Sequence, residues 1–238
     1  DLDAGPVSTA LLRRGPGTTT HCVILRAPDG ERMIVTAGDS TVRLRLDDAD
    51  RDAIRAADAV FVTAYTPDPV TSEIAEIAAE PNGPALAFDL SGPIEELRNR
   101  GTEPATIDHV VEIADLFVTA ELAAESYLDC PGHEAADVLR ERGCSRGAVT
   151  FGTDGATLFD GDERTRIAAF DVDAVDTTGA GDAFTAALAE RWLLGGDDAT
   201  EAGQFAAAAA ALNCRAEGAR GGLPDRAAVS AFLSERTD

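Results

Sequence analysis

The sequence predicts an α/β fold with a central, mostly parallel sheet and helices on both of its faces. Short apolar runs at 60–63, 85–88, 116–119 and 148–151 each follow a helical pattern, at 47–57, near 70–79, at 105–113 and at 133–142. The runs are apolar throughout, which is typical of parallel strands buried on both faces. This alternation favours one layered unit, so we treat 1–238 as a single domain.

Two hairpins accompany the alternating region. Strand-forming runs at 21–26 and 32–36 enclose turn residues 27–31, and runs at 156–159 and 167–170 enclose 160–162. Three helices are predicted after residue 176: one opening near 180, one over 202–214 and one over 225–234. In the first, Phe184, Leu188 and Trp192 recur every four residues before Gly195 and Gly196 end the helix.

The charge balance excludes several functions. The chain has 43 acidic residues against 20 basic ones, all of them arginine, and a formal net charge of −23. Without lysine there is no Walker A loop, protein-kinase β3 lysine or Schiff-base chemistry. The acidity argues against a nucleic-acid or membrane partner. It favours a halophilic source, while a GC-rich genome that prefers arginine codons is the alternative.

Four scattered cysteines, Cys22, Cys130, Cys144 and Cys214, form no C-x-x-C pair, which is typical of reduced thiols in a cytoplasmic protein. The sequence contains no membrane-length apolar run and no signal-peptide pattern. We therefore expect a cytoplasmic location.

The stretch Asp176-Thr177-Thr178-Gly179-Ala180-Gly181-Asp182 opens the helix that carries Phe184. Amide groups at the start of a helix have no intrahelical partner and can bind an anion. Asp182 would place a proton acceptor beside that anion, as transfer of a phosphoryl group to a hydroxyl requires. The alternative is a glycine turn whose aspartate only caps the helix.

The string D-T-T-G-A-G-D-A-F resembles the signature of the ribokinase-like (PfkB-type) carbohydrate kinases. The resemblance implies the ribokinase-like fold and an ATP-dependent phosphotransferase that moves the γ-phosphate to a sugar hydroxyl, with Mg²⁺ on the phosphates. It implies Asp182 as the catalytic base and the amides of Gly179, Ala180 and Gly181 as the anion hole. The acceptor would be a small sugar or sugar acid, which the sequence does not identify, and a homodimer is compatible with the family.

Two further segments resemble the family in order and spacing. Thr150, Gly152, Thr153 and Gly155 match its T-x-G-x-x-G nucleotide segment, and Ala207 would lie near the adenine. A strand-to-hairpin turn is the alternative for the first segment. The resemblance also offers a monovalent cation site for K⁺, and an ordinary helix with a glycine-rich end is the alternative there. Its ligands would come from Asp176, Thr178, Asn213, Ala216, Gly218 and Gly222.

One family motif is altered. The family carries N-x-x-E after the strand at 116–119, where it organises magnesium and phosphate, but this chain has Ala120 and Ala123 there. Glu121 and Glu125, one helical turn apart, either substitute through water or are solvated surface acids. The altered motif leaves a second function open, a non-catalytic nucleotide-binding or regulatory relative, whereas a vitamin-precursor kinase would carry cysteine at Asp182.

The resemblance does not include the family's amino-terminal G-G-x-x-N segment, where acceptor hydroxyls are held. We expect the amino-terminal part of the family fold to be missing, with 1–14 forming the helix that follows that segment. The hairpin within 18–37 would then be a remnant of the lid and substrate wall.

Overall fold

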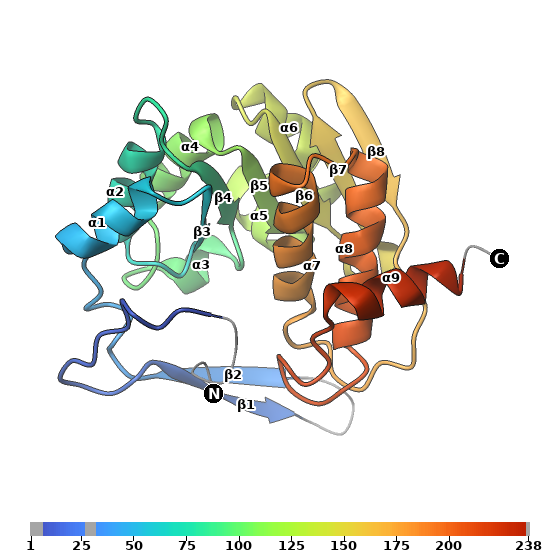
Figure 1. Cartoon of the computed structure of the whole chain (residues 1–238), viewed down its shortest axis with the longest axis horizontal. Coiled ribbons are helices and arrows are strands. Elements are labelled where there is room, and N and C mark those ends of the chain that lie inside the picture. The colour runs from blue at the N-terminus through green and yellow to red at the C-terminus, as the bar shows by residue number, and fades with distance from the viewer. Residues whose placement is uncertain (1–6, 27–31, 237–238) are drawn as a thin grey trace.

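The main sheet lies at the centre of the computed structural model, which describes residues 7–26 and 32–236 (Figure 1). Its six strands follow the order β3-β4-β5-β6-β7-β8; β3 to β6 run parallel, and β7 and β8 add antiparallel pairs at one edge. The strands are β3 (Ala59–Thr63), β4 (Ala85–Asp89), β5 (Leu116–Ala120), β6 (Arg146–Thr150), β7 (Ala156–Asp160) and β8 (Glu163–Ile167). The predicted fold class is confirmed.

Helices cover both faces of this sheet because its strands present apolar side chains alternately to either side. Leu86 and Phe88 belong to one buried cluster and Ala87 to the other. Phe88 stacks on Phe117 with ring centroids 5.5 Å apart. The first face carries α2 (Asp68–Ala78), α4 (Pro104–Ile113), α5 (Glu121–Leu128) and α6 (Ala135–Glu141); the second carries α7 (Ala180–Leu188) and α8 (Ala199–Asn213).

The remaining elements are short or peripheral. They are α1 (Asp48–Arg55), α3 (Ile94–Leu97), the 3-10 turns η2 (Gly132–Glu134) and η3 (Gly152–Asp154), the π-helical segment η4 (Ala189–Leu194) and α9 (Arg226–Ser234). Phe184, Leu188 and Trp192 are all buried against the sheet, as their spacing predicts. The helical periodicity of α7 continues into η4, so the pattern alone does not distinguish the two.

A separate hairpin of β1 (His21–Arg26) and β2 (Arg32–Ala37) lies below the main sheet in Figure 1. Val23 pairs with Val35 and Leu25 with Met33, so these four exposed side chains share one face. The predicted strands are present, while the predicted turn 27–31 lies outside the described residues. The role of this hairpin as part of a lid stays a prediction.

Two local predictions are wrong. The strand expected at 167–170 is β8 (Glu163–Ile167), because Asp160 pairs directly with Glu163 and the turn between them holds only Gly161 and Asp162. The helix expected over 1–14 is absent from its described part, where 7–14 has no helix and Leu11 and Leu12 are exposed. An amphipathic helix is stabilised by burying its apolar face, and these leucines are about half exposed or more.

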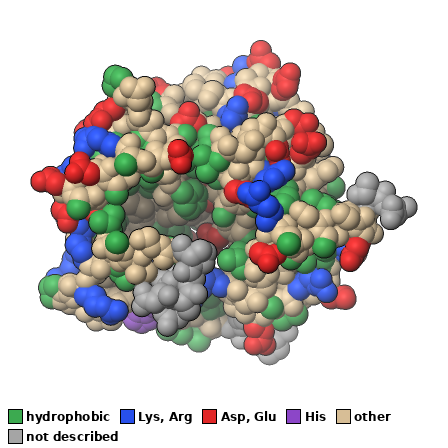
Figure 2. Space-filling model, viewed as in Figure 1, with side chains coloured by type: hydrophobic (Ala, Val, Ile, Leu, Met, Phe, Trp, Pro, Cys, Tyr) green, Lys and Arg blue, Asp and Glu red, His purple; other side chains and the backbone are tan. Residues whose placement is uncertain are grey.

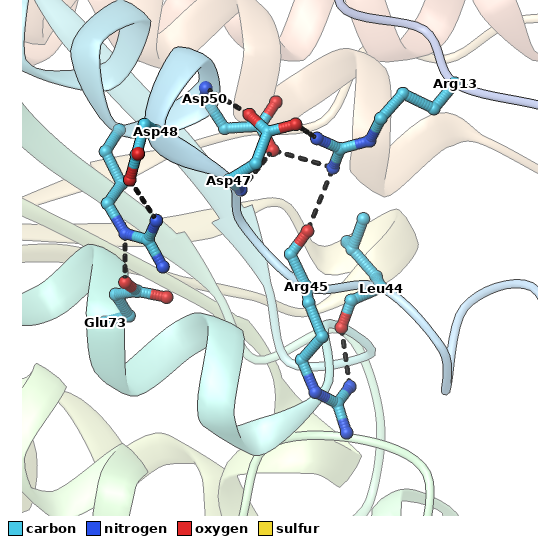
Figure 3. Close-up of polar contacts among 8 residues, drawn as sticks. Arg13, Leu44, Arg45, Asp47, Asp48, Asp50 and Glu73 are labelled. Atoms are coloured by element: carbon cyan, nitrogen blue, oxygen red, sulfur yellow. Dashed lines mark hydrogen bonds and ion pairs between the residues drawn. The ribbon is translucent and has the colours of Figure 1, made fainter.

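Charged contacts hold this amino-terminal segment instead. Arg13 forms ion pairs with Asp47 and, at 2.7 Å, Asp50, and donates to the Arg45 carbonyl at 2.9 Å (Figure 3). Asp47 and Asp50 also form the capping box that begins α1. Arg51, on the same helix, bridges Asp48 and Glu73 of α2. The arginines therefore connect acidic segments to one another.

Acidic side chains are scattered over the face shown in Figure 2, many of them near its outline, with arginines among them. A hollow is visible between the hairpin side of the molecule and the helices above it. Within 7–26 and 32–236, no helix is both long and apolar enough to cross a membrane.

Gly155 and Gly152 offer a matched stability test because both have positive φ, +89° and +57°. A Cβ at Gly155 would lie 2.0 Å from the Ile167 carbonyl oxygen, whereas one at Gly152 would meet nothing within 4 Å. We expect Gly152→Ala to lower the free energy of unfolding by about 1 kcal/mol and Gly155→Ala by about 3 kcal/mol or more. Urea denaturation measures both; equal losses would contradict the close approach.

Candidate active site

A cavity of about 580 Å³ lies at the carboxyl end of β6, beside the start of α7. Ligands commonly bind outside the carboxyl ends of strands in α/β sheets. The cavity joins the two predicted groups, because Thr150, Gly152, Thr153, Gly155 and Ala207 line it together with Ala180 and Gly181. Its other lining residues are Ala156, Ala169, Phe170, Asp171, Val172, Ala174, Thr177, Phe184, Ala210, Ala211 and Cys214.

One wall of the cavity is a smooth face of α8. Ala207, Ala210, Ala211 and Cys214 recur at i, i+3, i+4 and i+7, so they lie on one side of this helix. Their small side chains leave room for a flat apolar group against the helix. Phe170 and Phe184 add aromatic surface to the same cavity, which suits a nucleotide base.

The turn that begins α7 has the geometry its glycines allow. Gly179, the residue that caps the helix, has φ +81°, and a Cβ there would lie 2.3 Å from the Ala219 carbonyl oxygen. Only glycine fits a left-handed position this close to another backbone segment. The cap therefore brings the signature turn against the loop that follows α8.

The three predicted anion-hole amides are not equivalent. Among the described residues, the Gly179 and Gly181 amides have no hydrogen-bond partner, and Gly181 lines the cavity. The expectation that all three amides point into the cavity is wrong for Ala180, because its amide donates to the Thr177 carbonyl at 3.2 Å and closes the turn that precedes α7. Two donors are thus available to an anion, with the positive end of the helix dipole behind them.

Asp182 follows Gly181 in the first turn of α7 and is not itself a lining residue of the cavity. Its side chain is exposed, yet the surrounding protein limits its hydration, and this desolvation raises the pKa of its carboxyl above the ordinary value. A carboxylate with a raised pKa is a better proton acceptor. Asp182 is placed to act on a group that lies beside the cavity.

A second carboxylate, Asp89, ends β4 close to Asp182. Asp89 is buried, and burial raises the pKa of its carboxyl; the nearby charge of Asp182 adds to this rise. Its oxygens accept hydrogen bonds from the Thr185 hydroxyl at 2.8 Å and the Ser91 amide at 2.7 Å. Sequence reasoning missed Asp89, although it is the first polar residue after the apolar run of a buried strand, a position where ligand sites occur.

The residues predicted for a monovalent cation lie around the junction of the signature turn and the loop after α8. Asp176 accepts from the Thr178 amide at 3.0 Å and the Gly218 amide at 3.1 Å. Asn213 donates through Nδ2 to the carbonyls of Thr178 and Ala219, each at 3.2 Å, while its buried Oδ1 has no partner among the described residues. An unpartnered buried oxygen fits a hard cation, so Asn213 is the most specific candidate ligand.

The other two members of that predicted set lie on the same loop. A Cβ at Gly222 would lie 2.5 Å from the Asn213 carbonyl oxygen, and one at Gly221 would lie 3.4 Å from Cβ of Ala216. The structure thus brings the six residues to one junction, and the binding of a cation there stays a prediction.

The altered N-x-x-E positions provide no metal ligands. Glu125 accepts a hydrogen bond from the Gly132 amide at 3.0 Å, and the Glu121 side chain lies where a Cβ at Gly132 would be, 2.4 Å from Cγ. Both acids therefore lie against η2. No group of three or more His, Cys, Asp or Glu side chains suited to a metal occurs in the described ranges. These residues do not fit a protein-held Mg²⁺.

The sequence of the chain matches a known family. The model of the pfkB family carbohydrate kinases matches residues 2–226. The chain belongs to this family. The sequence-based resemblance is confirmed.

An ATP-dependent ribose-1-phosphate kinase from Halopiger xanaduensis is 35% identical over 222 residues, which cover 93% of this chain and 70% of that protein. A ribokinase from Arabidopsis thaliana is 29% identical over 90% of this chain and 57% of its own length. The solved ribokinase from Thermotoga maritima has a TM-score of 0.78 at 26% identity, covering 93% of this chain and 72% of its own. The chain therefore spans 57% of the length of the Arabidopsis ribokinase and 70–72% of the other two proteins.

Substitutions of Gly179 and Gly181 test two different roles in the signature turn, one in stability and one in ligand binding. We expect Gly179→Ala to lower the free energy of unfolding by about 2–4 kcal/mol, because its Cβ would collide with Ala219. A Cβ at Gly181 would have no atom within 4 Å, so Gly181→Ala should leave the stability unchanged. Its methyl group would lie beside the cavity and should weaken ATP binding about tenfold. Urea denaturation and calorimetric titration with ATP measure these effects; unchanged ATP affinity in Gly181→Ala would contradict an anion at this amide.

The raised pKa of Asp182 predicts a pH-dependent change in stability. Its ionised form is disfavoured in the fold, so the stability associated with the neutral acid is present at low pH and lost as the pH rises through the folded pKa. Asp182→Asn should therefore increase the free energy of unfolding at pH 7, and the gain should vanish toward pH 3. Denaturation across this range measures it, with exposed Asp173→Asn as the control; a gain independent of pH would be inconsistent with a desolvated carboxylate.

Proposed function

We propose that this chain carries the ATP-binding and phosphoryl-transfer half of an ATP-dependent sugar kinase. One observation carries the proposal: a cavity suited to a purine base runs up to the open Gly181 amide, and Asp182 follows directly on the same helix. The similarity to an ATP-dependent ribose-1-phosphate kinase and to ribokinases supports the same reaction class. A solved Arabidopsis ribokinase with ribose and ATP has a TM-score of 0.77 at 26% identity.

In this proposal the base of ATP lies between the alanine face of α8 and the aromatic side chains of the cavity. The phosphates extend toward the start of α7, where the amides of Gly179 and Gly181 donate to the γ-phosphate oxygens. Ala180 contributes only if its bond to Thr177 opens. These donors stabilise the charge of the transferring phosphoryl group without a cationic side chain.

Asp182 would orient the acceptor hydroxyl and take its proton as the oxygen–phosphorus bond forms. Because Asp182 lies near Asp89 at the end of β4, the acceptor would bind on this side of the cavity, away from the base. Proton transfer can come late in a loose transition state, so a moderately raised pKa is sufficient. Mg²⁺ would arrive on the phosphates of ATP and offset their charge, because the described residues contain no group of three or more His, Cys, Asp or Glu side chains that would hold it alone.

The acceptor would be a sugar or sugar phosphate. The relatives include a ribose-1-phosphate kinase and ribokinases, so ribose and ribose 1-phosphate are the first acceptors to test. The segment that would hold acceptor hydroxyls in the family has no counterpart among the matched motifs.

A second function has one observation in its favour. Ala120 ends β5 and Ala123 lies in α5 where the family has its N-x-x-E side chains, and the neighbouring acids contact η2. A nucleotide-binding relative without turnover would account for this loss. The presence of Asp182 favours catalysis, because a protein that only binds nucleotide has no use for a base at this position.

Asp182→Asn distinguishes the two functions. We expect phosphorylation of ribose or ribose 1-phosphate by ATP to fall about a thousandfold, because the general base is lost, while ATP affinity changes little. Coupled ADP release measures turnover and calorimetry measures binding. Turnover that survives this substitution would contradict the mechanism, and ATP binding without turnover in wild type would favour the binding function.

A further inference from the structure

Asp89 and Thr185 join two elements that are far apart in the sequence. Asp89 is the last residue of β4, and Thr185 lies in α7; the Thr185 hydroxyl donates to Asp89 Oδ2 at 2.8 Å. Both side chains are buried, with 7% of Asp89 and 1% of Thr185 exposed. A buried hydrogen bond to a carboxylate is among the stronger ones, and it is costly to leave unmade.

The position of Thr185 gives this bond a consequence for the site. Thr185 follows Asp182 by three residues, so both side chains lie on the same side of α7, one turn apart. The side that faces the end of β4 therefore carries the proposed base and the bonded hydroxyl together. The charge of Asp182 acts on Asp89, which agrees with this proximity.

Ser91 fixes the carboxylate that receives this bond. The Ser91 amide and hydroxyl donate to Asp89 Oδ1 at 2.7 and 3.1 Å, and the same hydroxyl contacts the Asp89 carbonyl at 3.0 Å. One oxygen of Asp89 is thus held by its own loop and the other is directed at α7. The carboxylate is oriented before any ligand binds.

We propose that Asp89 is a positioning residue that fixes the first turn of α7 through Thr185. The bond sets how far this helix is rotated and shifted against the sheet, and with it the direction of the Gly181 amide and of Asp182. This inference rests on the proposed binding of ATP phosphates at that turn. It assigns Asp89 a role without contact to the substrate.

AMP and ATP differ in their number of phosphates, so their affinities report separately on the base cavity and on the phosphate site. AMP reports the base cavity, while ATP also reports the amides at the start of α7. Thr185→Val removes the hydroxyl and keeps the shape, and Thr185→Ser keeps the hydroxyl. Thr71→Val is the matched control, because Thr71 of α2 is equally buried, bonds the Thr102 hydroxyl at 2.8 Å and lies on the other face of the sheet.

We expect Thr185→Val to weaken ATP binding about tenfold and to leave AMP binding within about twofold, as measured by calorimetric titration. Thr185→Ser should restore ATP binding to within about threefold of wild type. Thr71→Val should change neither affinity. Wild-type ATP affinity in Thr185→Val, or an equal loss of AMP and ATP affinity, would overturn the positioning role.

A second readout does not depend on nucleotides. The Ala183 amide donates to the Gly179 carbonyl at 2.9 Å and so reports whether the first turn of α7 is closed. Its hydrogen exchange should be about fivefold faster in Thr185→Val than in wild type or Thr71→Val, and unchanged exchange would count against the proposal. If Thr185→Val does not fold, Asp89→Asn, which keeps an oxygen acceptor but loses the charge, takes its place in both measurements with a smaller expected effect.

The nucleotide affinities of the wild type and the variants distinguish a failure of the proposed function from a failure of the role of Asp89. A wild-type chain that binds neither AMP nor ATP would remove both. A wild-type chain that binds ATP, with a loss in Gly181→Ala but none in Thr185→Val, would leave the proposed function standing and remove only the role of Asp89.

Discussion

The first turn of α7 is held in place from two sides, and the candidate site depends on this constraint. On one side Gly179 lies so close to the Ala219 carbonyl that no side chain fits between them. On the other side Thr185 bonds the buried carboxylate that ends β4. A helix start fixed in this way keeps two amide donors without a hydrogen bond to the protein. Leaving these donors unpaired lowers the stability of the fold, but it makes them available to an anion.

The charge of the protein makes these amides important. With 43 acidic residues against 20 arginines and a formal charge of −23, the protein as a whole repels phosphates. Several of its arginines are engaged elsewhere: Arg13 pairs with Asp47 and Asp50 (Figure 3), and Arg51 pairs with Glu73. Backbone donors and the dipole of α7 can stabilise phosphate charge without those side chains. A highly acidic protein and a phosphate site are therefore compatible.

Much of the fold could be predicted from the sequence, because local apolar patterns decide it. The four buried parallel strands and the helices between them follow from continuous apolar runs and helical spacing, and the signature turn shows its glycines directly. The peripheral elements were harder to predict. Because the turn holds only Gly161 and Asp162, β8 begins four residues before the predicted strand. The segment 7–14 forms no helix, although its sequence pattern predicts one.

The candidate site could be predicted only in part, because the sequence shows local motifs but not contacts between distant residues. Motif residues such as Gly181 and Thr150 are visible in the sequence, and the structure brings them to one cavity. The aromatic contribution of Phe170 and the bond between Asp89 and Thr185 depend on contacts between distant segments. No spacing rule connects residues 96 positions apart.

A structure of this chain with a non-hydrolysable ATP analogue and Mg²⁺ tests the central claim most directly. The base should occupy the cavity beside Ala207 and Ala211, with the γ-phosphate within hydrogen-bond distance of the Gly181 amide and next to Asp182. A nucleotide bound elsewhere, or phosphates directed away from the start of α7, would contradict the assignment of this turn as the phosphate site.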